Sequence, residues 1–155
     1  MKKQINFMLN GEKRIVELLP SQTLLEMLRE TLGIKSPKCG CDRGDCGSCT
    51  VMLDGRSVRS CLVLAVEVDG REVKTLEGTM PGGELSGLQK SFLVHNSFQC
   101  GFCAPGVILS AGELLEKNPH PGRDEIQEAI SGNLCRCTGY IPIIDAIVDY
   151  AKEEK

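Results

Sequence analysis

The sequence has no tryptophan, and aromatic residues make up only 4% of its 155 residues. It also has no excess of positive charge, because its formal net charge is -3 and its Lys and Arg residues are scattered. Proteins that bind nucleic acids or anionic membranes usually concentrate basic residues in one patch. We therefore expect no nucleic-acid partner and a core built mainly from aliphatic side chains.

Long apolar runs are absent as well. No stretch approaches the roughly 20 apolar residues that a helix needs to span a bilayer, so we predict no membrane insertion. The first residues, Met1-Lys2-Lys3, lead directly into alternating sequence without the apolar segment and cleavage site of a signal peptide. No twin-arginine pair is present there either. We expect a cytoplasmic protein.

Histidine is scarce, but cysteine is not. The only two histidines, His95 and His120, are isolated in the sequence, so surface or capping roles are expected for them rather than metal binding. Nine cysteines remain, and in a reducing compartment so many thiols favour metal binding over disulfides.

Eight of the nine cysteines form two sets of four. In the first set the spacings are x4, x2 and x11, and the first two of these are typical of plant-type [2Fe–2S] ligation. In the second set they are x2, x31 and x1. Glycines interleave or flank both sets, where close backbone approach can bring N–H donors to an anionic cluster. The predicted metal ligands are Cys41, Cys46, Cys49 and Cys61 in the first set, and Cys100, Cys103, Cys135 and Cys137 in the second.

The ninth thiol, Cys39, does not fit the x4-x2 spacing. We interpret it as a bystander, with substitution for Cys41 as a ligand as the alternative. Two four-thiolate sets without another reactive group predict an electron conduit that works between partners, so no catalytic residue is expected on this chain. Two other functions stay open: a free-standing ferredoxin-like carrier, and a zinc-binding adaptor, although Cys135-x-Cys137 is tighter than structural zinc spacings.

The first half of the chain predicts strands around one helix. Asn10-Gly11 and Asp54-Gly55 are dipeptides that accept positive φ at two-residue hairpin turns. Thr23 and Glu26 form a capping box, and Gly33 suits a left-handed helix end. The expected elements are a hairpin of residues 4–9 and 14–18, a helix over 24–32, a hairpin of 50–53 and 57–62 whose far strand carries Cys61, and a closing strand over 73–76.

The second half has helical periodicity. Pro105 and Pro142 lie near two helix starts, where a missing N–H is tolerated. Candidate helices cover 86–96, 106–117, 124–131 and 142–152. Gly and Pro interrupt any regular element between the halves. We predict a domain over 1–76, a linker over 77–84 and a second domain over 85–155, each with a small core that depends on its metal for stability.

Three segments carry a family resemblance: residues 40–49 (GCDRGDCGSC), 99–106 (QCGFCAPG) and 131–140 (SGNLCRCTGY). In this order they resemble the iron–sulfur subunit of the molybdenum hydroxylases, the xanthine dehydrogenase, aldehyde oxidoreductase and carbon monoxide dehydrogenase family. The resemblance covers nearly the whole chain. It implies an α+β fold, with a plant-type ferredoxin β-grasp domain followed by an all-α four-helix bundle domain, each binding one [2Fe–2S] cluster.

The resemblance also implies a role and partners. A large subunit would hold the molybdopterin cofactor, an FAD-binding medium subunit would accept electrons, and the complex would be a dimer of heterotrimers. The cluster on the second cysteine set would lie nearer the pterin, with Gln99 and Cys137 at the contact. The substrate would bind outside this chain, so purines, other N-heterocycles, aldehydes, carbon monoxide and aromatic thioesters all stay open.

Several residues depart from the family pattern without touching a predicted ligand. They are Arg43 where the family often has Glu, Ser48 where it often has Ala, and Ala104 where it often has Thr. Arg43 adds positive charge near an anionic cluster and could raise its potential, while a solvated arginine is the simpler expectation. Arg136, between two predicted ligands, either offsets cluster charge or points toward a partner.

Overall fold

Two hairpins begin the sheet, and both turn where expected. The computed structural model describes residues 1–153. Asn10 and Gly11 have φ values of 52° and 82°, and Asp54 and Gly55 have 47° and 77°, so both dipeptides adopt the left-handed conformation of tight hairpin turns. The strands are β1 (Lys3–Leu9), β2 (Glu12–Leu18), β3 (Thr50–Leu53), β4 (Arg56–Arg59) and β5 (Glu72–Lys74).

The short strand β5 joins the two hairpins into one sheet. It pairs parallel to β1 and antiparallel to β3, which gives the strand order β2-β1-β5-β3-β4. The closing strand is therefore present, although it begins one residue earlier and ends two residues earlier than predicted. The buried face of the sheet packs against α1 and the turn after it in one hydrophobic core.

Helix α1 begins as predicted but does not continue as a regular α-helix. Thr23 caps α1 (Leu24–Glu26), and the Glu26 carboxylate accepts a hydrogen bond from the Thr23 backbone at 2.7 Å. The chain continues as a π-helical turn (Met27–Thr31), in which the Leu32 N–H reaches back five residues to the Met27 carbonyl. Gly33 ends the segment at φ 71°. One face of this segment therefore faces the sheet, while Leu25 contacts the buried cysteines of the first set.

The expectation that a strand carries Cys61 is wrong. Strand β4 ends at Arg59, and Cys61 lies in a 3-10 turn (Ser60–Leu62). The Ser60 hydroxyl donates to the Cys49 carbonyl at 2.6 Å, and the Ser60 N–H donates to the same oxygen at 3.4 Å. Beyond these bonds the chain turns out of the sheet, which places Cys61 beside Cys49.

Four helices follow, close to the predicted positions, so the α+β class is confirmed. Ser86 and Gln89 form a capping box at the start of the first, and Pro105 lies in the first turn of the second. The four helices share one hydrophobic core, separate from that of the sheet. They are α2 (Gly87–Val94), α3 (Ala104–Lys117), α4 (Arg123–Ile130) and α5 (Ile141–Glu153).

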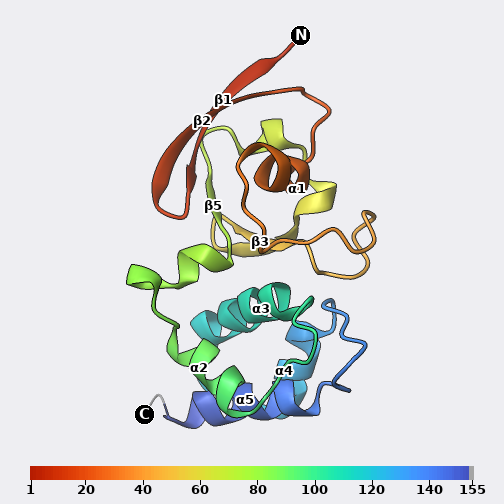
Figure 1. Ribbon diagram of the computed structural model, residues 1–155. Coiled ribbons are helices and arrows are strands. Elements are labelled where there is room, and N and C mark those ends of the chain that lie inside the picture. The colour runs from red at the N-terminus through yellow and green to blue at the C-terminus, as the bar shows by residue number, and fades with distance from the viewer. Residues whose placement is uncertain (154–155) are drawn as a thin grey trace.

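Helix α3 connects the two parts, because it packs against β3 and β4 as well as against α4. Figure 1 shows the sheet on one side of α3 and the other helices on the opposite side. The loops over 35–49 and 131–140, which carry predicted ligands, lie on the same side of the molecule. Within residues 1–153, no helix is long and apolar enough to cross a membrane.

Candidate metal centres

The four sulfurs of the first set come together as two pairs. Cys49 Sγ lies 3.4 Å from Cys61 Sγ, and both residues are buried. Cys41 Sγ accepts hydrogen bonds from the backbone N–H of Cys46, at 3.4 Å, and from the Cys46 thiol. One pair therefore lies in the interior and the other at the half-exposed end of the loop.

The surroundings of the two pairs shift the thiol pKa values in opposite directions. Backbone N–H groups of Cys46, Arg43 and Asp45 point at the Cys41 sulfur and lower its pKa to about 7. Burial, with the neighbouring Cys49 thiol, raises the pKa of Cys61 to about 12. Hydrogen bonds therefore favour a thiolate at Cys41, whereas burial disfavours one at Cys61 and outweighs the backbone hydrogen bond from Gly44.

The second set forms pairs in the same way. Cys137 Sγ lies 3.6 Å from Cys100 Sγ, and both residues are exposed. Cys103 is buried at the start of α3, and its thiol donates a hydrogen bond to Cys135. Burial, followed by the interaction with Cys135, raises the pKa of Cys103 to about 12.

The peptide around Cys135 is held by Thr138 and Tyr140. The Cys135 N–H donates to the Tyr140 hydroxyl at 2.8 Å, and that hydroxyl donates to the Asn133 carbonyl at 3.3 Å. The Thr138 hydroxyl lies 3.2 Å from Cys135 Sγ. Burial tends to raise the pKa of Cys135, but hydrogen bonds from Thr138 and from the Cys137 and Thr138 backbone outweigh it and lower the pKa.

These residues fit two binuclear clusters. Among residues 1–153, no three Cys, His, Asp or Glu side chains converge on a point that could hold a single metal ion. The sulfurs instead lie in two pairs per set, and a [2Fe–2S] cluster needs four thiolates shared between two irons. Backbone N–H groups already point at Cys41, Cys100 and Cys135, where an anionic cluster needs donors.

Gln99 and Cys137, the predicted contact with the pterin, are in contact with each other. Gln99 Nε2 donates to the Cys137 carbonyl at 3.1 Å. Both residues are exposed. Three large apolar side chains in or next to the ligand segments are exposed as well: Phe102 (44%), Leu134 (55%) and Ile141 (62%).

The two ligand loops are joined by a direct hydrogen bond. The Leu134 N–H donates to the carbonyl of Cys46 at 2.9 Å. Cys46 belongs to the first set, and Leu134 is bonded directly to Cys135 of the second. We call this hydrogen bond the Cys46–Leu134 bridge.

Asn133 supports the bridge from inside the molecule. Only 1% of it is exposed. Its Nδ2 donates to the Gly47 carbonyl at 3.1 Å and to Thr50 Oγ1 at 3.2 Å, and its Oδ1 accepts from Ser110 Oγ at 2.8 Å. The sequence analysis missed these supporting roles of Asn133, Thr50 and Ser110, and also Arg59. The one available signal was that Asn133 stands next to the Leu-Cys-Arg-Cys segment.

Glycines allow this close approach. A Cβ on Gly47, whose φ is 75°, would lie 2.2 Å from the Gly132 carbonyl oxygen and 2.8 Å from Asn133 Nδ2. A Cβ on Gly106 would lie 2.5 Å from the Gly47 carbonyl oxygen. At Gly47 the two loops meet backbone to backbone, and at Gly106 the start of α3 meets the first loop in the same way, which only glycine permits.

The remaining polar residues singled out in the sequence lie at the surface or make other contacts. Cys39 is exposed, and partial desolvation with nearby Asp42 and Cys49 raises its pKa. Arg136 is exposed. The other contacts are Arg43 with Asp45 at 2.6 Å, His95 with Asp149 at 3.3 Å, and His120 Nδ1 with the Ala151 carbonyl at 2.9 Å.

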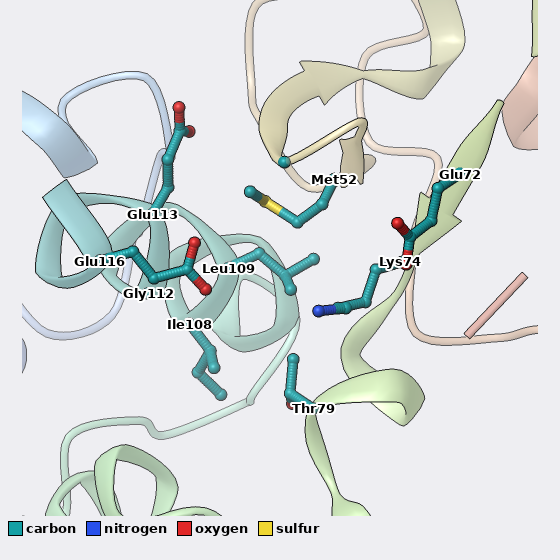
Figure 2. A pocket seen from close by; sticks show the side chains of 10 residues that line it. Met52, Glu72, Lys74, Thr79, Ile108, Leu109, Gly112, Glu113 and Glu116 are labelled. Atoms are coloured by element: carbon teal, nitrogen blue, oxygen red, sulfur yellow. The ribbon is translucent and has the colours of Figure 1, made fainter. Parts of the chain in front are cut away.

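A groove of about 260 Å³ lies where α3 faces β3 and β5 (Figure 2). Lys74 and Glu116 extend into it from opposite sides, with Leu109 between them. Its lining includes no cysteine. The groove is therefore separate from both metal centres.

Comparisons with known proteins agree with this geometry. Residues 7–78 match the model of the 2Fe-2S iron-sulfur cluster binding domain, and residues 75–148 match that of the [2Fe-2S] binding domain. The nicotinate dehydrogenase small FeS subunit of Eubacterium barkeri is 50% identical over 96% of this chain and 94% of its own length. The nicotine 6-hydroxylase small subunit of Paenarthrobacter nicotinovorans is 47% identical over 94% and 88%.

A solved structure agrees across both parts of the chain. The crystal structure of quinoline 2-oxidoreductase from Pseudomonas putida 86 superimposes with a TM-score of 0.95 and 47% identity, covering 99% of this chain and 94% of the matched chain. Sequence, fold and paired sulfurs agree, and this chain belongs to the family of two-cluster iron–sulfur subunits of the molybdenum hydroxylases.

Proposed function

We propose that this chain passes electrons one at a time between a molybdopterin site on a large subunit and an FAD subunit or another acceptor. The observation that carries the proposal is the Cys46–Leu134 bridge, which joins two four-thiolate sets within one folded unit. Two one-electron carriers in series suit a partner that oxidises its substrate by two electrons.

We assign one cluster to each set and one iron to each sulfur pair. The irons of the first cluster would be held by Cys41 with Cys46 and by Cys49 with Cys61. Those of the second would be held by Cys100 with Cys137 and by Cys103 with Cys135. Bound there, each cluster supplies reversible one-electron redox chemistry. The chain's own part is to hold, insulate and align them.

The exposed edge of the second set is the proposed contact with the large subunit. Cys100, Cys137 and Gln99 are open to solvent there, and Phe102 and Leu134 expose apolar surface on the same ligand segments. A partner would bury this surface and exclude water from the exposed sulfurs. The first cluster would then lie toward the flavin.

The finer architecture is also a proposal. We divide the chain into a β-grasp ferredoxin domain over 1–76, a linker over 77–84 and a four-helix bundle domain over 85–155. The two separate hydrophobic cores support this division. A dimer of heterotrimers in the cytoplasm is the assembly that we propose for the complex.

The names of the relatives suggest where to begin with substrates. Nicotinate, nicotine and quinoline, after which the three compared proteins are named, are aromatic nitrogen heterocycles. We propose this class for the complex to which the present chain belongs. The pocket that selects among its members would lie on the large subunit.

Elemental analysis of the native complex tests the proposed function. We would purify the chain gently from its host and count iron, zinc and molybdenum in one sample by mass spectrometry. About four irons per chain, with molybdenum in a co-purifying large subunit, is the expected result. Four irons on a chain without partners would instead indicate a free carrier, and zinc in place of iron would refute electron transfer.

A further inference from the structure

Arg59 spans the junction between the two metal centres. It is the last residue of β4 and stands two positions before Cys61. Its Nη1 donates to Thr50 Oγ1 at 2.8 Å, and its Nη2 donates to the Gly132 carbonyl at 2.6 Å. Gly132 stands three positions before Cys135. The guanidinium therefore links the backbone next to one cysteine set with the backbone next to the other.

Its bond to Gly132 supports the Cys46–Leu134 bridge. Gly132 is followed by Asn133 and Leu134, and the Leu134 N–H makes the bridge to the Cys46 carbonyl. Thr50, the other partner of Arg59, also accepts from Asn133 Nδ2 and donates to the Gly47 carbonyl. Arg59 thus contacts the chain on both sides of the bridge: Gly132, two positions before Leu134, and Thr50, whose hydroxyl binds the Gly47 carbonyl next to Cys46.

The positive charge of Arg59 has no carboxylate partner in the described part of the chain. Arg43, Arg71 and Arg123, by contrast, are paired with Asp45, Asp54 and Asp145, whereas Arg56 and Arg136 resemble Arg59 in forming no ion pair within residues 1–153. None of the ion pairs within residues 1–153 includes Arg59, whose hydrogen bonds go to a hydroxyl and a carbonyl. Its side chain is half-buried, so solvent screens this charge only in part.

We propose that Arg59 is a positioning residue for electron transfer between the two centres. Its fork holds the Cys46–Leu134 bridge in place, and its unpaired charge favours the reduced, more negative form of the clusters on either side. The inference rests on the proposed function, because it needs both clusters to be present. It adds a residue outside the two cysteine sets that influences the relative position of the two clusters and their reduction potentials.

Two substitutions separate the charge from the hydrogen bonds. Arg59→Gln removes the charge and also, because its amide nitrogen is two bonds closer to the backbone than Nη2, the donor to the Gly132 carbonyl. Arg59→Lys keeps the charge but loses the planar fork that binds two acceptors at once. Gly132→Ala is a third variant, which disturbs the hydrogen bonds of Arg59 without removing its charge. Its Cβ would lie 2.3 Å from Arg59 Nη2 and push the guanidinium aside. Arg56→Gln is the matched control, because it removes the same charge from an exposed position on the same strand.

Each variant would be studied in the purified complex. Redox titration followed by electron paramagnetic resonance (EPR) gives the midpoint potentials, and amide hydrogen exchange of Leu134 reports on the bridge. For Arg59→Gln we expect lower potentials, with about a tenfold shift in the reduction equilibrium of at least one cluster, or about 59 mV for one electron. For Arg59→Lys and Gly132→Ala we expect faster exchange at Leu134 and potentials close to those of the parent. Arg56→Gln should change neither.

Unchanged potentials in Arg59→Gln would overturn the proposal, and so would unchanged Leu134 exchange in Arg59→Lys. Should either variant fail to retain iron, Gly132→Ala decides the matter through the exchange of Leu134, because the charge stays in the molecule. The parent complex separates this test from that of the proposed function. Two EPR signals and four irons per chain, together with molybdenum in the co-purifying large subunit, support the proposed function whatever the Arg59 variants show.

Discussion

At the scale of single residues, Cys137 distinguishes the two centres most directly. Its sulfur is exposed and lies 3.6 Å from Cys100 Sγ, in a part of the fold that has its own hydrophobic core. We expect Cys137→Ser to lose the second cluster and to lower the iron content from about four to about two per chain. The EPR signal of the first cluster should persist. Loss of both signals from a protein that stays folded would contradict independent sites.

Cys39 and Cys41 provide a matched pair for the first centre. Backbone N–H groups of Cys46, Arg43 and Asp45 stabilise a thiolate at Cys41, whereas Cys39 is exposed and its pKa is raised. We therefore expect Cys41→Ser to lose the first cluster and Cys39→Ser to keep full iron content. Iron analysis with visible absorption spectra measures both. The reverse pattern would make Cys39 the ligand.

At the scale of elements, the Glu77 carboxylate anchors the segment that leads into the first cysteine loop. It accepts from Ser36 Oγ at 2.6 Å, from the Ser36 N–H at 3.3 Å and from Thr75 Oγ1 at 2.5 Å. Partial desolvation tends to raise the pKa of Glu77, an exposed residue, but the hydrogen bonds from Ser36 and Thr75 outweigh it and hold the pKa below its ordinary value. The ionised carboxylate therefore stabilises the folded chain.

The lowered pKa of Glu77 predicts that its contribution to stability depends on pH. Because the folded pKa is depressed, the stabilisation is present above the unfolded pKa of about 4.3 and is lost as pH falls through the folded value. Glu77→Gln should lower the free energy of unfolding by about 1 kcal/mol at pH 7, with the difference shrinking below about pH 4. Urea unfolding at several pH values measures it. The control is Glu84→Gln, exposed at the same junction, and an equal effect there would refute the anchor.

Local sequence signals predicted the individual helices and strands better than they predicted the contacts between them. Asn10-Gly11 and the Thr23 cap determine a turn and a helix start through neighbouring residues, and both are confirmed. The pairing of β5 with β1 and β3 depends on packing across the chain, which no short motif encodes. The end of β4 was misplaced for the same reason, since the 3-10 turn of Ser60–Leu62 places Cys61 beside Cys49 through contacts between separate segments of the chain.

In the candidate site, too, local spacing was informative and contacts between distant segments were not predicted. Cysteine spacing was enough to group the eight predicted ligands into two sets, and the structure brings the sulfurs of each set together in pairs. Their division into pairs depends on the path of the loops in space. Arg59 and its Gly132 partner are 73 residues apart, so neither position marks the other in the sequence.

At the scale of the whole molecule, the closeness of the two loops connects stability with function. The Cys46–Leu134 bridge and the buried Asn133 side chain require Gly47 to lie against the 132–133 backbone. Another hydrogen bond crosses the junction, from the Ser57 N–H to a Glu113 carboxylate oxygen at 2.9 Å. The relative position of the two clusters thus depends on these polar contacts as well as on the packing of α3 against β3 and β4. A substitution that separates the loops should therefore lower the stability and weaken the Cys46–Leu134 bridge at the same time.

Gly47→Ala tests this directly, with Gly55→Ala as its control. Both glycines have nearly the same positive φ, 75° and 77°, so both alanines carry a similar backbone strain of about 1 kcal/mol. The Cβ at residue 55 meets open space, whereas that at residue 47 would lie 2.2 Å from the Gly132 carbonyl oxygen. We expect Gly47→Ala to lower the unfolding free energy by about 2 kcal/mol more than Gly55→Ala, because buried hydrogen bonds between the loops are lost. Urea unfolding and Leu134 amide exchange would measure the two effects. Equal losses in both variants, with Leu134 still protected, would show that the loops tolerate separation.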